Sequence, residues 1–342
     1  MVSVLGGFAA EPLASMPREP LASMSPRPRP NVITFTGDIL LDRGVRQRIE
    51  AAGGDVLFTP AIDSILAASD IVVGNLECPA TSIHAPAYKH FVFRAEPAWL
   101  DILRRHHFTH LNLANNHSVD QGRRGLEDTH RQVLAHGMTP IGAAPTAEVA
   151  AQPVLLVPPS PEQAAEPVLL FPPSPSSRTS SVSVPGGFPA GKPVFLLPTL
   201  RLPLEHFFPL PSMWSVSQDA DTTLLRRVRD LRRAHPKAII IVTPHWGWEH
   251  HTRPEPEQRQ LARALIDAGA DCIIGHHPHT LQTHETYRGR HIFYSIGNFI
   301  FDQTRPVNTR AAIVTLTITA DTLSVRSTPI RIHRCAPYVA KM

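Results

Sequence analysis

The chain has 342 residues, of which 42% are apolar and 18% charged, with a net charge of +4 and a pI of about 9.2. That length allows one large α/β domain or two small ones, each with a substantial core. The mild basic excess comes from scattered or helical arginines, so it gives no case for a nucleic-acid-binding protein.

The cysteines and the apolar runs indicate the cellular compartment of the protein. The three cysteines form no C-x-x-C pair, which argues against a disulfide framework and fits a reducing compartment. No run of about 20 apolar residues occurs, so no membrane-spanning helix is expected. Residues 1–10 lack a basic region and predict no secretory signal. We therefore expect a cytoplasmic protein.

Proline divides the chain. Of its 35 prolines, 6 fall in residues 1–30 and 15 in residues 150–212, where short phrases are also repeated. Dense proline removes backbone donors and blocks helices. We predict a disordered N-terminal segment over 1–30 and one domain over 31–335, interrupted by a Pro-rich, low-complexity insert at about 146–212. Residues 194–197 are interpreted as the remnant of a strand inside that insert, which raises the hypothesis of an impaired fold.

Between these segments, helical and strand patterns alternate. The predicted helices cover 43–52, 60–68, 97–105, 123–136, 221–234 and 255–268. The predicted strands cover 32–36, 71–73, 110–114, 139–141, 238–242 and 271–274, followed by 291–295, 311–319 and 323–332. Alternation of β and α with a β-rich tail predicts a layered α/β sandwich.

Five of the predicted strands run directly into ligand-type side chains. The strand ends carry Asp38, Asn75 with Glu77, Asn115 to His117, His245, and the run Gly275-His276-His277-Pro278-His279. Open α/β sheets bind ligands beyond the carboxyl ends of their strands, and imidazole is the commonest protein metal ligand. The five strand ends therefore predict a shared crevice that binds a divalent cation.

Single residues in these segments also have structural interpretations. Asp38 can cap the following turn, and Asn115 and Asn116 can be turn residues. Trp246 and Trp248 either form a pocket wall or pack in the core.

Residues near His245 and Glu77 raise further alternatives. His250 and His251 are expected on a solvated loop, whereas Glu249 can orient a ligand histidine. Asn298 can line the site, as can Asp302. Cys78 can line it too, but a thiolate beside a carboxylate is disfavoured as a nucleophile.

Several phrases resemble one protein family. They are Gly37-Asp38-Ile39-Leu40-Leu41-Asp42-Arg43-Gly44, Gly74-Asn75-Leu76-Glu77, Ala114-Asn115-Asn116-His117 with Asp120 and Gly122, His245-Trp246-Gly247, Gly275-His276-His277-Pro278-His279, and Tyr294-Ser295-Ile296-Gly297-Asn298-Phe299. Over residues 32–145 and 220–305 the chain resembles the CapA-type capsule synthesis proteins, also called poly-γ-glutamate biosynthesis proteins. That family is similar to the calcineurin-like metallophosphoesterases, which implies a four-layer α/β sandwich with two metals.

The resemblance implies a role for each matching residue. The implied metal ligands are Asp38, Glu77, Asn116, His245, His277 and His279. His117 matches a histidine that contacts substrate and can protonate a leaving oxygen. Residues implied to touch substrate or to orient the ligands are Asn75, Asn115, Trp246, Glu249, His276 and Asn298.

The ligand set indicates the kind of metal. Imidazole with carboxylate suits Mn, Zn or Fe, and two cations bridged by a carboxylate can clamp an in-line displacement. Where the phosphoesterase motif has histidine, this chain has Leu40, and Glu77 replaces the bridging aspartate. We therefore expect one or two cations, with Asp42 or His276 as substitute ligands.

Two functions follow as hypotheses. The first is a metal-dependent hydrolase or transferase that acts on a phosphoryl, amide or glutamyl bond in capsule or poly-γ-glutamate biosynthesis. The second is a non-catalytic accessory subunit that binds anionic polymer for synthesis or export. Both predict an anionic, phosphorylated or glutamyl ligand and allow the polymer synthesis machinery as a partner.

Overall fold

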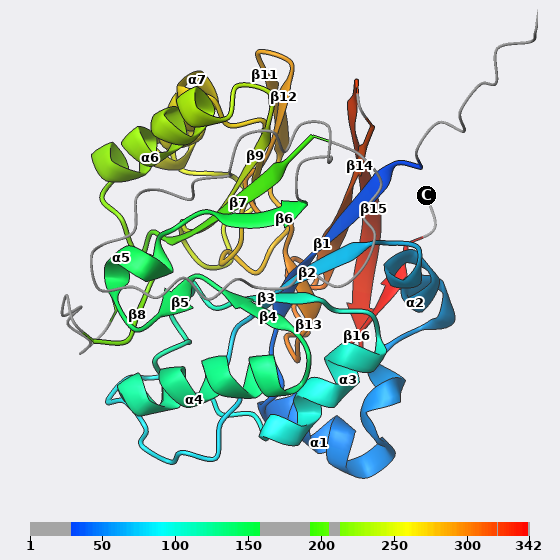
Figure 1. The fold of residues 1–342 in the computed structure, drawn as a ribbon. Coiled ribbons are helices and arrows are strands. Elements are labelled where there is room, and N and C mark those ends of the chain that lie inside the picture. Colours follow the sequence, from blue (N-terminus) through cyan, green and yellow to red (C-terminus); the bar gives the residue numbers. More distant parts are fainter. Residues whose placement is uncertain (1–28, 158–191, 205–212, 320, 341–342) are drawn as a thin grey trace, which may run out of the picture.

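The computed structural model describes residues 29–157, 192–204, 213–319 and 321–340. Two β-sheets pack face to face, with helices on the outer side of each (Figure 1). The prediction for residues 1–28 and for most of the Pro-rich insert lies outside the described residues.

The larger sheet has the order β16-β15-β14-β1-β2-β3-β4, with β13 also paired to β1. Its strands are β1 Asn31–Ile39, β2 Ile71–Leu76, β3 His110–Asn112, β4 Thr139–Ile141, β13 Asn298–Ile300, β14 Arg310–Ile318, β15 Leu323–His333 and β16 Ala336–Val339. Strands β1 to β4 run parallel, and the C-terminal strands β14 to β16 form an antiparallel meander.

The smaller sheet has the order β11-β12-β10-β9-β7-β6. Its strands are β6 Val154–Val157, β7 Val194–Leu200, β9 Ile239–His245, β10 Cys272–Ile274, β11 His284–Tyr287 and β12 Arg290–Phe293. A separate pair joins β5 Ala143–Ala144 to β8 Ser215–Val216. The central strands β7, β9, β10 and β12 are parallel, so their carboxyl ends meet at one edge.

The helices complete the outer layers. They are α1 Arg43–Ala52, α2 Pro60–Ala67, α3 Leu100–Arg105, α4 Gly122–Ala135, α5 Ala147–Ala150, α6 Asp221–Ala234 and α7 Pro256–Ala268, with short 3-10 helices η1 Gly54–Leu57 and η2 Pro97–Trp99. Asp42 begins α1 as its N-cap, and the left-handed Gly137 follows α4.

Three buried clusters fix the order of layers. One lies between the larger sheet and α1 to α4, and another lies between the two sheets. The third lies between the smaller sheet and helices α6 and α7. In β9, Ile239 and Ile241 face the inter-sheet cluster, whereas Ile240 and Val242 face the helices. The predicted four-layer α/β sandwich is confirmed.

Residues 147–200 include part of the predicted insert. The described residues there form α5, β6 and β7. Strand β7 is buried along its whole length and pairs with β9 from Val194 to Leu200. The hypothesis that the insert displaces a central strand is therefore wrong for this sheet.

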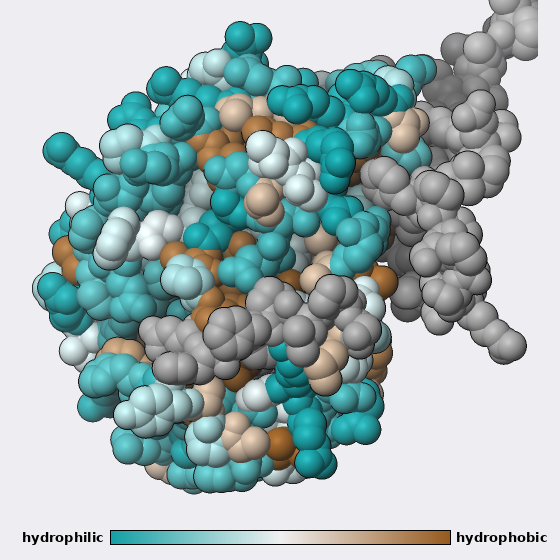
Figure 2. Space-filling model, turned by 90° about the vertical axis from the view of Figure 1, so that its left-hand side faces the viewer, coloured by the Kyte–Doolittle hydropathy of each residue, from teal (hydrophilic) through white to brown (hydrophobic). Residues whose placement is uncertain are grey.

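Polar and apolar residues are mixed on the surface (Figure 2). The face in Figure 2 is mostly hydrophilic, and polar residues break up its apolar patches. None of the helices formed by the residues described here is long and apolar enough to cross a bilayer.

Gly275, at the end of β10, tests how tightly the site is built. A Cβ placed there would lie 2.0 Å from the Tyr294 carbonyl oxygen and 2.6 Å from Trp246 Nε1. We expect Gly275→Ala to lower the free energy of unfolding by about 1–3 kcal/mol, because backbone must move. Urea unfolding measures this. Gly54→Ala is the control, since the three atoms nearest to its Cβ would be side-chain atoms of Ile102 and not backbone. Equal stability of both variants would contradict the expectation.

Candidate metal centre

The predicted strand ends meet where the two sheets converge. Asp38 lies in β1 and pairs in register with Asn75 of β2 and with Asn298 of β13. From the other sheet, His245 ends β9 and forms a bridge to His276 beyond β10. The crevice is thus built from both sheets.

Short distances connect the two sides. His245 Nε2 lies 2.9 Å from Asn116 Oδ1 and 3.8 Å from Glu77 Oε1. His279 Nδ1 lies 3.3 Å from Asp38 Oδ2, and its Nε2 lies 3.5 Å from Glu77 Oε1.

These residues form two overlapping groups able to hold a cation. Glu77, His245 and His277 form one group, and Asp38, Glu77 and His279 form the other. Within each group the potential ligand atoms lie within 4.8 Å of one another, and all five residues are buried. Glu77 is common to both, so it stands between the two positions.

Orphaned polar atoms support a cation in these positions. Both carboxylate oxygens of Glu77, together with Asp38 Oδ2 and His277 Nδ1, are buried and make no hydrogen bond within the described part of the chain. Buried carboxylate oxygens without partners are costly unless a cation or proton compensates them. The donor set therefore fits a divalent ion.

Burial and nearby charges shift the pKa values of Glu77, Asp38 and His279. Burial raises the pKa of Glu77 well above its usual range. Burial acts in the same direction on Asp38, but His276 and His279 hold the pKa of that carboxyl well below its ordinary value. Burial opposes protonation of His279, yet Glu77 and Asp38 raise its pKa to about 10.

The other two histidines are neutral. Burial lowers the pKa of His245 well below its ordinary value, and burial together with His279 lowers the pKa of His277 to about 3. Neutral imidazole is the form that binds metals. At the group that contains His279, a cation would displace a proton.

Asparagines orient the histidines and carboxylates. Asn75 Nδ2 donates to Asp38 Oδ1 at 2.9 Å and lies 3.3 Å from His245 Nδ1. Asn298 Oδ1 lies 2.9 Å from His279 Nδ1. Asn115 Nδ2 donates to the Leu76 carbonyl at 2.8 Å and so ties β2 to the loop after β3.

His117 belongs to a charged chain at the edge of the centre. Its Nδ1 donates to Asp120 Oδ2 at 2.8 Å, and Lys89 Nζ lies 2.6 Å from Asp120 Oδ1. Lys89 also donates to the Asn116 carbonyl at 2.9 Å. Burial lowers the pKa of His117, and Asp120 opposes that shift. With Nδ1 bonded to Asp120, His117 has Nε2 left for a substrate.

Backbone strain is concentrated in the same loop. His277 has φ of 98° and His279 has φ of 54°, both in the left-handed region that non-glycine residues seldom adopt. Such strain is found where surrounding contacts impose it, often at functional sites.

Some predicted residues lie elsewhere than the sequence analysis places them. Asp42 caps α1 and pairs with Arg46 at 3.0 Å, which gives it a structural role instead of one as a substitute ligand. His276 Nδ1, by contrast, lies 3.2 Å from Asp38 Oδ1. Leu40 is buried in the apolar cluster under the helices. Cys78 is also buried there, and burial raises its thiol pKa.

The two tryptophans have different environments. Trp246 is buried, and its Nε1 donates to the Tyr294 carbonyl at 2.8 Å, so most of the ring packs in the core. Trp248 is 66% exposed. His250, expected on a solvated loop, is half-buried and lies 2.9 Å from Asn308 Nδ2 through its Nδ1, whereas His251 is exposed as expected. The sequence reasoning did not single out Lys89 or Asn308.

A cleft of about 720 Å³ opens beside the centre. Its lining includes Asn116 and His277, together with Trp246, Trp248 and Glu249. Because two of the predicted ligands line it, the cleft gives a substrate access to the centre.

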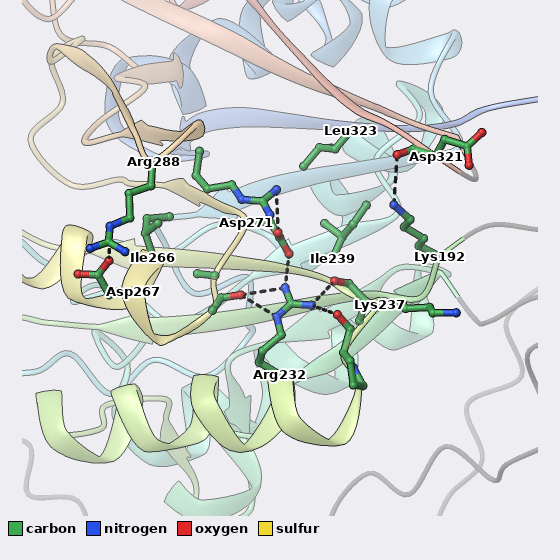
Figure 3. A pocket seen from close by; sticks show the side chains of 15 residues that line it. Lys192, Arg232, Lys237, Ile239, Ile266, Asp267, Asp271, Arg288, Asp321 and Leu323 are labelled. Carbon is green, nitrogen blue, oxygen red and sulfur yellow. Dashed lines mark hydrogen bonds and ion pairs between the residues drawn. The ribbon is translucent and has the colours of Figure 1, made fainter.

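Another hollow, of about 880 Å³, lies at the opposite ends of the strands of the smaller sheet (Figure 3). Most of its charged side chains bond to one another or to backbone. Arg232 Nη2 lies 2.5 Å from Asp271 Oδ2, and Lys192 donates to the Asp321 carbonyl at 3.3 Å. These pairs tie strands and helix together, and we assign this hollow no chemistry.

Comparisons with known proteins agree with the motifs. The family model described as "Bacterial capsule synthesis protein PGA_cap" matches residues 32–303. The chain belongs to this family. The PGA biosynthesis protein CapA of Bacillus subtilis is 32% identical over 90% of this chain and 73% of the relative.

Two further matches extend the comparison. The capsule biosynthesis protein CapA of Bacillus anthracis is 30% identical over 79% of this chain and 60% of the relative. Among solved structures, the sulfate thiohydrolase SoxB of Thermus thermophilus is 12% identical and covers 83% of this chain and 41% of its own, with a TM-score of 0.40.

Proposed function

We propose that the protein is a metal-dependent hydrolase or transferase of capsule or poly-γ-glutamate biosynthesis. The ligands of one or two divalent cations, of Mn, Zn or Fe type, are Asp38, Glu77, Asn116, His245, His277 and His279. The observation that supports this most strongly is the position of Glu77, which belongs to both ligand groups and whose two oxygens are buried without hydrogen bonds in the described chain.

The chain's own residues have distinct tasks in this proposal. A divalent cation held there supplies Lewis-acid polarisation of a substrate oxygen. Asn75 and Asn298 fix the ligand side chains. His117 moves a proton at Nε2, since Asp120 occupies its Nδ1. A cationic centre favours substrates that present an anionic or carbonyl oxygen, such as a phosphoryl, amide or glutamyl group.

The printed names of the relatives support the polymer context. Both Bacillus relatives are named as PGA or capsule biosynthesis proteins. We extend that context to this chain, with a glutamyl or phosphorylated envelope polymer as substrate and the polymer synthesis machinery as a possible partner.

A second candidate function is a non-catalytic accessory subunit that binds anionic polymer through its metal. Leu40, where the related phosphoesterase motif has histidine, favours it, because the group of Asp38, Glu77 and His279 then has a single imidazole. A weaker cation position can bind anions without activating a nucleophile.

One experiment separates the two functions. The full chain is purified, its metals are counted by elemental analysis, and turnover of phosphoesters and γ-glutamyl peptides is measured after chelation and after return of Mn or Zn. Turnover restored by the metal supports the hydrolase or transferase. Metal-dependent polymer binding without turnover supports the accessory subunit, and a protein that binds no metal contradicts both.

A further inference from the structure

The cleft beside the metal centre differs in chemistry from the centre itself. Beyond Asn116 and His277, its walls carry carboxylates and one guanidinium. They are Asp221, Glu249, Glu255 and Glu257 against Arg201. A centre expected to take an anionic or carbonyl oxygen therefore opens into an acidic cleft.

Three of these four carboxylates, Glu249, Glu255 and Glu257, have no Arg or Lys partner among the described residues. Asp221 pairs with Arg201, and Glu255 lies 2.7 Å from His251 Nδ1 and caps α7. In the part of the chain that the structure describes, Glu249 has only His250 Nε2 at 3.8 Å, and exposed Glu257 has no ion-pair partner. Negative charge at this wall is thus available to a ligand.

An aromatic side chain of the cleft, Trp248, directly precedes Glu249 in the chain. Trp248 lines the cleft and is 66% exposed, although exposed tryptophan is apolar area that water solvates poorly. A tryptophan face with carboxylates nearby is the arrangement that attracts an organic cation. A volume of about 720 Å³ is in the range of small-molecule sites.

A buried donor in the same wall points to a ligand acceptor. Gln258 is 5% exposed, and its Oε1 accepts from the Glu255 backbone N–H at 2.9 Å. Its Nε2 is buried and has no partner within the described residues. Since Gln258 lines the cleft, that N–H group can be satisfied by an oxygen of a bound molecule.

We propose that this cleft binds the amino-terminal end of an aminoacyl or peptide ligand. The ammonium group lies against Trp248, Glu249 and Glu257, and a carbonyl oxygen of the same end accepts from Gln258 Nε2. The proposal deepens the proposed function, on which it rests for the substrate that extends from the cleft into the metal centre. It assigns the acidic cleft to the cationic end of that substrate.

Calorimetric titration of the full chain tests it with two probes, the dipeptide γ-glutamyl-glutamate and its N-acetylated form. The wild type is expected to bind the free-amine dipeptide at least about tenfold more tightly. The double variant Glu249→Gln/Glu257→Gln is expected to reduce that preference to about one. Asp101→Asn, an exposed carboxylate of α3 outside the cleft, is the matched control and keeps the preference.

Three results overturn the proposal: equal affinity for both dipeptides, an unchanged preference in the double variant, or no binding of either probe. Elemental analysis of the same samples separates this failure from failure of the proposed function. Bound metal and metal-dependent turnover with equal dipeptide affinities refute only the cleft assignment. A preference for the free amine without bound metal refutes only the metal-dependent function.

Discussion

Glu77→Gln is expected to abolish metal binding at both cation positions. Glu77 is the one carboxylate that the groups containing His245 and His279 share. An amide offers one neutral oxygen in place of two anionic ones, so neither position keeps its charge balance. Elemental analysis after dialysis measures the result. Glu50→Gln, on the exposed side of α1, serves as the control that retains metal.

Glu77→Gln is expected to stabilise the metal-free protein, although it abolishes metal binding. Without a cation, both oxygens of Glu77 are buried and lack hydrogen bonds in the described chain. Removing that carboxylate is expected to raise the free energy of unfolding of the chelated protein by about 1–2 kcal/mol. With metal present, the wild type is expected to be the more stable protein, because it alone gains stability from the ion.

The sign of the pH dependence follows from the raised pKa of Glu77. Below the ordinary glutamic acid pKa of about 4.3, Glu77 is protonated in the folded and unfolded chains and contributes no pH dependence to stability. As pH rises through the raised folded-state pKa, the metal-free wild type loses the stability linked to protonated Glu77, a loss that the variant does not share. Denaturant unfolding in chelator at several pH values measures this. A variant that binds metal normally, or that is less stable than wild type in chelator at high pH, would refute Glu77 as the shared ligand.

The sequence allowed much of the fold to be predicted because most elements have strong local patterns. Helices α1 and α6 have the predicted bounds, since each has a clear apolar stripe and defined ends. The strand predicted over 238–242 instead ends at His245. Its last residues include Pro244, which is a weak strand former, and pairing with β7 extends the strand past it.

Elements held by distant partners were not predictable from local patterns. Strand β13 has three residues and owes its pairing to β1, which is more than 250 residues away in sequence. Strand β7 lies beside dense proline, and its apolar run Val194–Leu197 continues through Pro198 and Thr199 only because β9 pairs with it. Such contacts depend on the tertiary structure.

Some residues of the candidate site could also be predicted from local patterns, and others could not. Asp38, Glu77 and His245 could be chosen because ligand-type residues follow apolar strands, and their convergence follows from parallel strands. Lys89 could not be chosen from the sequence, because it lies in a loop without a recognisable pattern and reaches Asp120 only in the folded chain. Whether each tryptophan packs or lines the cleft also depended on the fold. Trp246 is buried, and Trp248 is exposed.

His117→Ala is expected to lower kcat by about 10²–10⁴-fold while bound metal stays at the wild-type level. His117 lies beside the proposed ligand Asn116 but belongs to neither cation group, so on the proposed mechanism its loss removes proton transfer without removing a ligand. Turnover of the best substrate and elemental analysis give the two readouts. His333→Ala, an exposed histidine on β15, is the control with unchanged turnover.

Asp120 allows the proton-transfer role to be separated from a structural one. Burial lowers the pKa of His117 below its ordinary value of about 6.5, and Asp120 opposes that shift while Lys89 adds to it. If protonated His117 is the acid, kcat falls as pH rises through that lowered pKa. Asp120→Asn removes the carboxylate that raises the pKa of His117 and leaves the charge of Lys89, which lowers it. The pKa of His117 therefore falls further, and the falling limb of the kcat profile moves to lower pH. A pH profile of kcat that is identical in wild type and Asp120→Asn would exclude His117 as the acid, because a residue with only a packing role predicts no movement of that limb.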